Sequence, residues 1–155
     1  MHILTCLRRG IVLGTLLLAG ALTAVMAAEA EAELQLDAVL VWGTNGPQTE
    51  NPKLKALRVE IRQKLQAVFK WTDYYEVDRK ALKVAAKQTR KVRLSPKCEI
   101  AVENLGRSTI EVRLYGEGKL VVRKKQTLTP GELLVLAGED RNDTAWFVVI
   151  SLKPA

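Results

Sequence analysis

The stretch "CEIAVENLGRSTIEVRLYGEGKLVVRKKQTL", residues 98–128, decides the fold class of this chain. Apolar residues recur in it at every second position, as at Ile110 and Val112, which is the period of a β-strand with one buried face. The segments Asn104–Arg107 and Gly116–Gly118 separate the apolar runs and contain Asn and Gly, which favour turns. The stretch therefore predicts three strands joined by short turns.

The same period recurs on both sides of this stretch. Between the runs lie segments rich in Gly, Pro, Asn and Asp, such as "GTNGPQTEN" at 43–51 and "GEDRND" at 138–143. The regular spacing of short strands and turns indicates an antiparallel sandwich or barrel-like sheet. Further strands are predicted over 34–42, 71–78, 82–84, 92–94, 133–137 and 144–152.

One segment has the period of a helix instead. Asn51-Pro52 resembles an N-cap followed by proline at the first helical position. The spacing of apolar residues predicts an amphipathic helix over about 52–69, with a basic opposite face. The sequence thus predicts an α+β fold in which this helix packs on an antiparallel, sandwich-like sheet of about seven to eight strands. The apolar positions that carry the helical period are Leu54, Leu57, Ile61, Leu65 and Val68.

Residues 1–27 have the anatomy of a secretory signal peptide. Arg8 and Arg9 supply positive charge, Ile11–Ala24 is an uncharged apolar run, and small residues follow it. We expect cleavage after Ala27, which places the mature chain in the bacterial periplasm or outside the cell. The alternative is an uncleaved anchor, which would keep the chain on the membrane.

The expected mature chain, 28–155, is a single α+β domain that starts with a short acidic arm over 28–33. It lacks histidine, because His2 is the only one in the sequence, so Ser-His-Asp and Cys-His nucleophilic systems are excluded in their usual form. Cys98 is then the only cysteine, and its alternating context predicts a buried small hydrophobe. We expect no catalytic residue, no metal and no cofactor.

Three carboxylates stand close together in "WTDYYEVD", residues 71–78. A pair of carboxylates can act as general acid and base or hydrolyse glycosides. In a regular strand Asp73 points away from Glu76 and Asp78, so at most two of the three converge. The alternative to a non-catalytic chain is therefore an envelope hydrolase that uses Glu76 and Asp78.

The stretch "RKALKVAAKQTRKVRL", residues 79–94, carries seven basic residues and no acid. Leu82 and Val84 alternate with basic residues, as do Val92 and Leu94, which favours two short strands and a connection. A helix over 78–88 remains the alternative. A second basic run, 123–125, would extend the basic surface if the strands were neighbours.

These residues are the candidate contacts of a small exported binding module. A basic face attracts anions, and an exported protein meets anionic envelope polymers or partner proteins more often than nucleic acid. A third hypothesis is an accessory subunit of an envelope assembly, which an exposed apolar patch or an unpaired edge strand would favour. The candidate contacts are Arg79, Lys80, Lys83, Lys87, Arg90, Lys91 and Arg93, with Tyr74 from the aromatic cluster.

Overall fold

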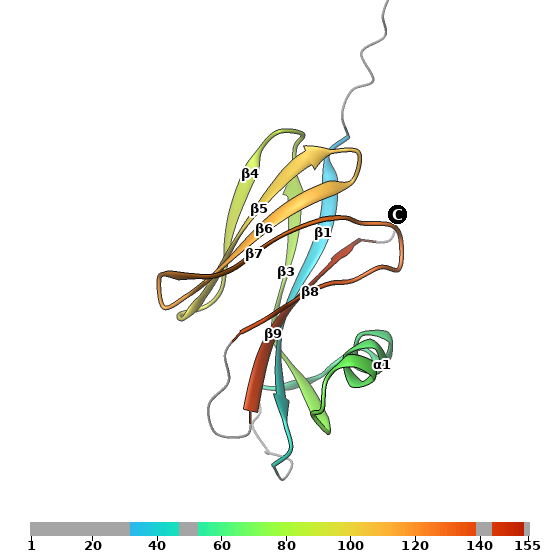
Figure 1. Ribbon diagram of the computed structural model, residues 1–155, viewed down its shortest axis with the longest axis vertical. Coiled ribbons are helices and arrows are strands. Elements are labelled where there is room, and N and C mark those ends of the chain that lie inside the picture. Colours follow the sequence, from blue (N-terminus) through green and yellow to red (C-terminus); the bar gives the residue numbers. More distant parts are fainter. Residues whose placement is uncertain (1–31, 47–52, 139–143, 154–155) are drawn as a thin grey trace, which may run out of the picture.

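The computed structural model describes residues 32–46, 53–138 and 144–153. Within them the chain forms two antiparallel sheets and one short helix (Figure 1). Sheet A has the strand order β2-β3-β1-β9-β8, and sheet B has the order β4-β5-β6-β7. The elements are β1 (Leu34–Thr44), β2 (Lys55–Ala56), α1 (Val59–Val68), β3 (Asp73–Val84), β4 (Thr89–Ser95), β5 (Cys98–Gly106), β6 (Thr109–Gly116), β7 (Lys119–Thr127), β8 (Leu134–Ala137) and β9 (Thr144–Leu152). The predicted signal peptide, most of the acidic arm and Asn51-Pro52 lie outside the described residues.

The two sheets enclose the larger apolar cluster, here called the sandwich core. The alternating pattern of each strand turns one set of side chains inward. Leu36 of β1, Ile100 of β5 and Ile150 of β9 are fully buried there. The three strands expected over 98–128 are β5, β6 and β7, with turns at 107–108 and 117–118. The sandwich-like, strand-rich architecture therefore follows the sequence prediction.

The helix packs on the opposite face of sheet A and makes a second cluster, the helix-side core. Ile61 and Leu65 of α1 are buried against Val39, Val41 and Phe147 of β1 and β9. Strands β1 and β9 are consequently apolar on both faces, which is typical of central strands covered on two sides. Sheet B lies toward one end of the molecule and α1 toward the other (Figure 1).

The helix is shorter than the predicted 52–69. Residues Lys55–Ala56 form β2 and pair with β3, so this part of the chain is extended and the helix begins only at Val59. At the other end Phe69 has extended backbone angles, and its amide donates to the Leu65 carbonyl at 2.8 Å. Val68, expected on the apolar face, is 75% exposed.

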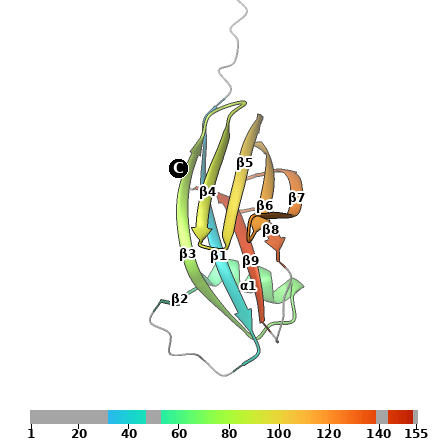
Figure 2. The same ribbon diagram turned by 90° about the vertical axis from the view of Figure 1, so that its left-hand side faces the viewer.

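The basic stretch 79–94 forms strands and no helix. Strand β3 continues to Val84, and Leu82 and Val84 are buried in the sandwich core. β3 belongs to sheet A and β4 to sheet B, so the turn between them crosses from one sheet to the other. In Figure 2 the two strands lie side by side along one side of the sandwich.

A β-bulge interrupts β3 at Val77. Glu76 pairs with Val41 and Asp78 with Leu40, which leaves Val77 without a partner in β1. An extra residue in one strand shifts the alternation of side chains by one position. Directly paired residues share a face of the sheet, so Glu76 lies on the helix side with Val41 and Asp78 on the sandwich side with Leu40.

Candidate binding groove

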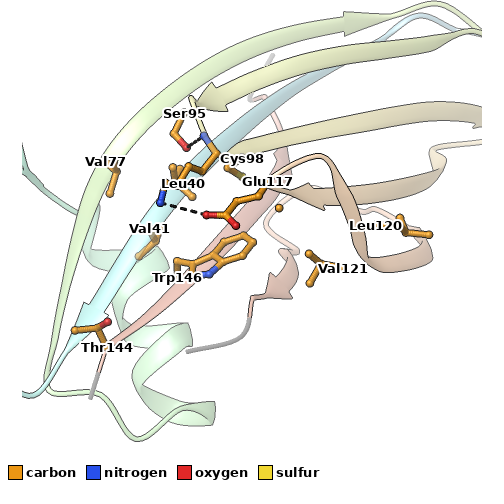
Figure 3. Close-up of a pocket in the computed structure, with 12 residues that line it drawn as sticks. Leu40, Val41, Val77, Ser95, Cys98, Glu117, Leu120, Val121, Thr144 and Trp146 are labelled. Atoms are coloured by element: carbon orange, nitrogen blue, oxygen red, sulfur yellow. Dashed lines mark hydrogen bonds and ion pairs between the residues drawn. The ribbon is translucent and has the colours of Figure 1, made fainter. Parts of the chain in front are cut away.

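A cavity of about 710 Å³ opens where sheet B ends and the sandwich face of sheet A continues beyond it. We call this cavity the groove. Strands of sheet A supply one wall, and the β4–β5 and β6–β7 hairpins of sheet B supply the other (Figure 3). The lining residues are mostly apolar, as in pockets that bind through burial of surface. They are Leu40, Val41, Val77, Thr144 and Trp146 of sheet A, and Ser95, Lys97, Cys98, Gly116, Glu117, Leu120 and Val121 of sheet B and its turns.

Exposed apolar side chains concentrate at the groove. Among the described residues six large hydrophobic side chains are exposed, and three of these line the groove. They are Val77 at 38%, Leu120 at 55% and Val121 at 39%. Single exposed apolar residues are common on protein surfaces, but a cluster of them marks an interaction site. The groove therefore gathers half of the exposed large apolar side chains of the described residues.

Two β-bulges, one in each sheet, supply two of these side chains. Val77 is the extra residue of β3, and Val121 is the extra residue of β7, since Leu114 pairs with Val122 and Tyr115 with Leu120. Both valines line the groove, and they lie on opposite sides of Trp146 in Figure 3. Bulges often redirect a side chain next to a functional site. The two sheets thus depart from regular pairing at the positions that shape the groove.

Gly138 leaves the space that the Trp146 ring occupies. A Cβ atom on Gly138 would lie 1.9 Å from the indole. The Gly138 amide also donates to the Trp146 carbonyl at 2.9 Å. A larger residue at position 138 would therefore displace the ring from the groove.

Aromatic residues extend from the groove across sheet A. Trp146 of β9 pairs with Trp42 of β1, and Trp42 pairs with Tyr75 of β3, so the three residues share one face of the sheet. The ring centroids of Trp42 and Tyr75 are 5.9 Å apart. The Tyr75 hydroxyl is buried and has no hydrogen-bond partner among the described residues. This face of sheet A therefore combines apolar rings with few polar groups.

An ion pair joins the tips of the two hairpins at the edge of the groove. Lys97 Nζ lies 3.2 Å from Glu117 Oε1, and the Glu117 amide donates to the Lys97 carbonyl at 2.8 Å. Ser95 Oγ accepts the Lys97 amide at 3.2 Å. These contacts hold the β4–β5 turn against the β6–β7 turn. They give the groove a polar rim above an apolar floor.

Cys98 lies beside this rim and is buried, as the sequence pattern predicts. Burial raises the pKa of its thiol from 9.0 to about 11. The thiol is therefore protonated at neutral pH, and a protonated thiol is a poor nucleophile. Cys98 contributes apolar surface to the groove.

The predicted basic contacts do not share one face. Lys83 lies on the outer face of sheet A, and Lys91 and Arg93 lie on the outer face of sheet B. Lys80 and Arg90 pair with Ala38 and Val102 of the sandwich core, so they lie on the core-facing side of their strands. Lys83, Arg90 and Lys91 are exposed, and Lys87 lies in the turn between β3 and β4. They follow the side of the molecule on which β3 and β4 are neighbours (Figure 2) and do not form one flat patch.

Several of these basic residues are already paired with acids. Arg79 donates to Glu76 at 2.6 Å and to Asp37 at 3.1 Å, and Arg58 also reaches Asp37 at 3.1 Å. The hydrogen bonds from Arg79 to Glu76 are the main cause of the raised pKa of Arg79. Weaker pairs are Lys80–Asp78 at 3.3 Å and Arg93–Glu99 at 3.7 Å. Pairing reduces the positive charge that these residues offer to a ligand.

The second basic run, 123–125, does not extend the first. It lies on β7, at the edge of sheet B opposite to β4, with β5 and β6 between them. Glu111 on β6 accepts from Arg123 at 2.8 Å and from Arg113 at 3.0 Å. The hydrogen bond from Arg123 is the main cause of the lowered pKa of Glu111. Acidic residues therefore separate the two basic runs.

The structure does not bring the candidate carboxylates together. The bulge at Val77 puts Glu76 and Asp78 on opposite faces of sheet A, whereas regular alternation would put them on the same face. No group of three His, Cys, Asp or Glu side chains within the described residues could hold a metal ion. The paired-carboxylate arrangement that a hydrolase needs is thus not formed by Glu76 and Asp78.

Tyr74 is placed in the helix-side core. It is 4% exposed, and its hydroxyl lies 3.4 Å from the Leu65 carbonyl and 3.5 Å from that of Phe69. Burial raises the pKa of its phenol. The ring therefore offers little surface to an external ligand. Its neighbour Tyr75 lies on the groove side of the sheet.

The groove residues were missed in the sequence because regular alternation hides a bulge. Val77 and Val121 stand in ordinary strand patterns, and no local signal marks either as an extra residue. The available hint was the pair of adjacent apolar residues Leu120 and Val121 directly after the turn, since adjacent side chains of a strand cannot both enter one core.

No helix of the described residues is long and apolar enough to span a bilayer. Comparisons with protein-family models, with curated proteins and with solved structures found no match to this chain.

Proposed function

We propose that this chain is an exported, non-catalytic interaction module that holds an extended apolar segment of a partner protein in the groove. The observation that carries the proposal is the pair of β-bulges that turn Val77 and Val121 toward Trp146 from two different sheets. Burying these side chains and Leu120 against a partner would remove apolar surface from water, which favours association. Export rests on the composition of residues 1–27.

A protein partner fits the described surfaces better than an anionic polymer does. Polymer binding depends on many unpaired cations along one path. Here the basic residues of 79–93 do not share one face, and Arg79, Lys80 and Arg93 are paired with acids. The exposed apolar cluster favours the accessory-subunit hypothesis instead.

Direct titration with a neutral probe tests the proposal. The probe is a short, labelled peptide of alternating valine and threonine, and the protein is the chain that begins after Ala27. Leu120→Asp places a charge at the groove, and we expect it to weaken binding of the probe about tenfold or more, because a charge would be buried against apolar atoms. The matched control is Val59→Asp, since Val59 is 50% exposed on α1, away from the groove.

Two outcomes would contradict the groove. Either the probe does not bind, or Leu120→Asp and Val59→Asp bind it equally well. If Lys83→Glu combined with Lys91→Glu weakens the binding of a purified anionic envelope polymer while Leu120→Asp does not, the partner is a polymer and the basic side is the site.

Export is tested separately. Mass spectrometry of the chain recovered from the producing cells should give a species that begins at Ala28 in the periplasmic or secreted fraction. An intact chain, starting at Met1 and dissolved in the cytosol, would remove the extracytoplasmic part of the proposal and leave the groove itself untouched.

A further inference from the structure

Strand β7 forms one lip of the groove and ends sheet B. Its first residues, Leu120 and Val121, line the groove, and the strand then runs on to Thr127. Within the described residues β7 pairs with β6 alone. Half of the backbone donors and acceptors of an edge strand point away from the sheet and can pair with another chain. An extended segment that leaves the groove along this lip would meet a ready-made pairing edge.

The side chains of β7 define the charge of such a segment. The strand carries Lys119, Arg123, Lys124 and Lys125 and no acid, and all four are exposed. Among the described residues the side chains of Lys119, Lys124 and Lys125 form no hydrogen bond or ion pair, whereas that of Arg123 bonds to Glu111. Complementary charge at a pairing edge directs partner choice. Acidic side chains on the added strand would therefore match this edge.

The charge pattern also excludes two other occupants of the edge. Lys124 pairs with Val112, so its side chain leaves the strand on the core-facing side. A charge pointing inward on an edge strand opposes unselective pairing with other chains. Two copies of β7 placed edge to edge would set Lys and Arg opposite Lys and Arg, which is destabilising. The edge thus rejects a second copy of this chain and favours an acidic strand from another protein.

We infer that the partner of this module contributes an extended segment with alternating acidic and apolar residues. Its apolar side chains enter the groove, and its backbone adds as a strand to the free edge of β7. Its acidic side chains then lie on the outer face of sheet B, beside Lys125, which pairs with Glu111. Strand addition gives affinity through main-chain hydrogen bonds, and side-chain pockets give specificity. The inference rests on the proposed function, because it assigns a sequence type and a binding mode to the segment that the groove holds.

Three probes of equal length test the inference on the same mature chain. One alternates valine with glutamate, one valine with threonine and one valine with lysine. We expect the acidic probe to bind about tenfold more tightly than the neutral one at low salt and to lose this advantage at high salt, since salt screens exposed charges. The basic probe should bind weakest.

Variants then locate the contact. Lys125→Glu should weaken binding of the acidic probe about fivefold and leave binding of the neutral probe unchanged, because only a charge on the outer face is altered. The matched control is Lys91→Glu, an exposed position on β4 at the other edge of sheet B. A version of the acidic probe with N-methyl groups on alternate residues, along the edge facing β7, should bind no better than the neutral probe.

The results separate this inference from the proposed function. If the neutral and acidic probes bind equally and both depend on Leu120, the groove stands and strand addition by an acidic segment is wrong. If the acidic probe binds but responds to the β4 control and not to the β7 variant, the assignment to β7 is also wrong. If the basic edge only prevents aggregation, the β7 variant will aggregate faster than the wild-type chain, and the acidic, neutral and basic probes will bind the wild-type chain equally. That result would contradict the inference.

Discussion

The two faces of sheet A beyond the end of sheet B differ in how they are covered. On the helix side, α1 buries the apolar face, and Val39, Val41 and Phe147 are at most 1% exposed. On the other face the cover stops at the hairpin tips, and Val77, which lines the groove, remains 38% exposed. The same central strands supply both faces. The contrast shows that an apolar strand face predicts burial against another surface. It does not show whether that surface belongs to the same chain or to a partner.

The largest expected effect comes from removing the cover on the helix side. Leu65→Ala should lower the free energy of unfolding by about 2–5 kcal/mol, because a fully buried side chain leaves a cavity. Leu120→Ala on the groove should change it by less than about 0.5 kcal/mol, because that side chain is half exposed. Urea denaturation of the mature chain measures both. Equal losses would mean that the groove is part of the folded core.

A side chain at position 138 should displace the Trp146 ring and so change the shape of the groove. Gly138→Ala puts a methyl group where the indole lies, so we expect a loss of about 1–3 kcal/mol in stability and weaker binding of the neutral probe. The same change in a Trp146→Val background should cost much less, since the clashing ring is absent. Additive losses in this double-mutant cycle would show that the glycine acts independently of the ring.

The ion cluster beside the helix gives a smaller effect. Arg79→Met leaves the buried carboxylate of Glu76 without its donor and leaves Asp37 with Arg58 alone, and we expect a loss of about 1–2 kcal/mol in the free energy of unfolding. Lys83→Met, an exposed position on the same face of β3, is the control and should stay within about 0.5 kcal/mol of wild type. If Arg79→Met lowers the free energy of unfolding no more than Lys83→Met does, the ion cluster contributes no more to stability than an exposed surface contact.

The smallest effect is a pH dependence that originates at the rim of the groove. Cys98 has a pKa of about 11 in the fold and about 9.0 when exposed, so above pH 9 the unfolded chain releases a proton that the folded chain keeps. The contribution of the thiol is therefore complete below pH 9 and declines as the pH rises toward 11. The stability difference between wild type and Cys98→Ala should shrink over this range. Since the raised pKa of Tyr74 is present in both proteins, it does not affect the comparison.

Local patterns were sufficient for the strands and turns over 98–128, but they divided β3 into separate strands over 71–78 and 82–84 and missed β2. The hairpins over 98–128 could be predicted because turn residues and alternating apolar positions lie within a few residues of each other. The helix was predicted at the right place but too long. The extended backbone at Lys55–Ala56 depends on pairing with β3, about twenty residues further along the chain. Such a long-range contact leaves no trace in the helical period.

The groove depends on contacts that sequence spacing cannot express. Its walls come from hairpins of one sheet and strands of another, and its position follows from where sheet B ends over sheet A. The basic stretch 79–94 illustrates the same limit. Its charge is visible in the sequence, but its distribution over two faces follows from the crossover between β3 and β4.

The extra residue at Val77 couples the two ends of β3. Everything from Asp78 to Val84 takes its orientation from that one insertion, including Arg79 beside the helix and Leu82 in the sandwich core. Loss of a single codon there would reverse these faces, turning Lys83 toward the interior and Leu82 toward water. The fold therefore tolerates substitutions along β3 far better than the insertion or deletion of a residue.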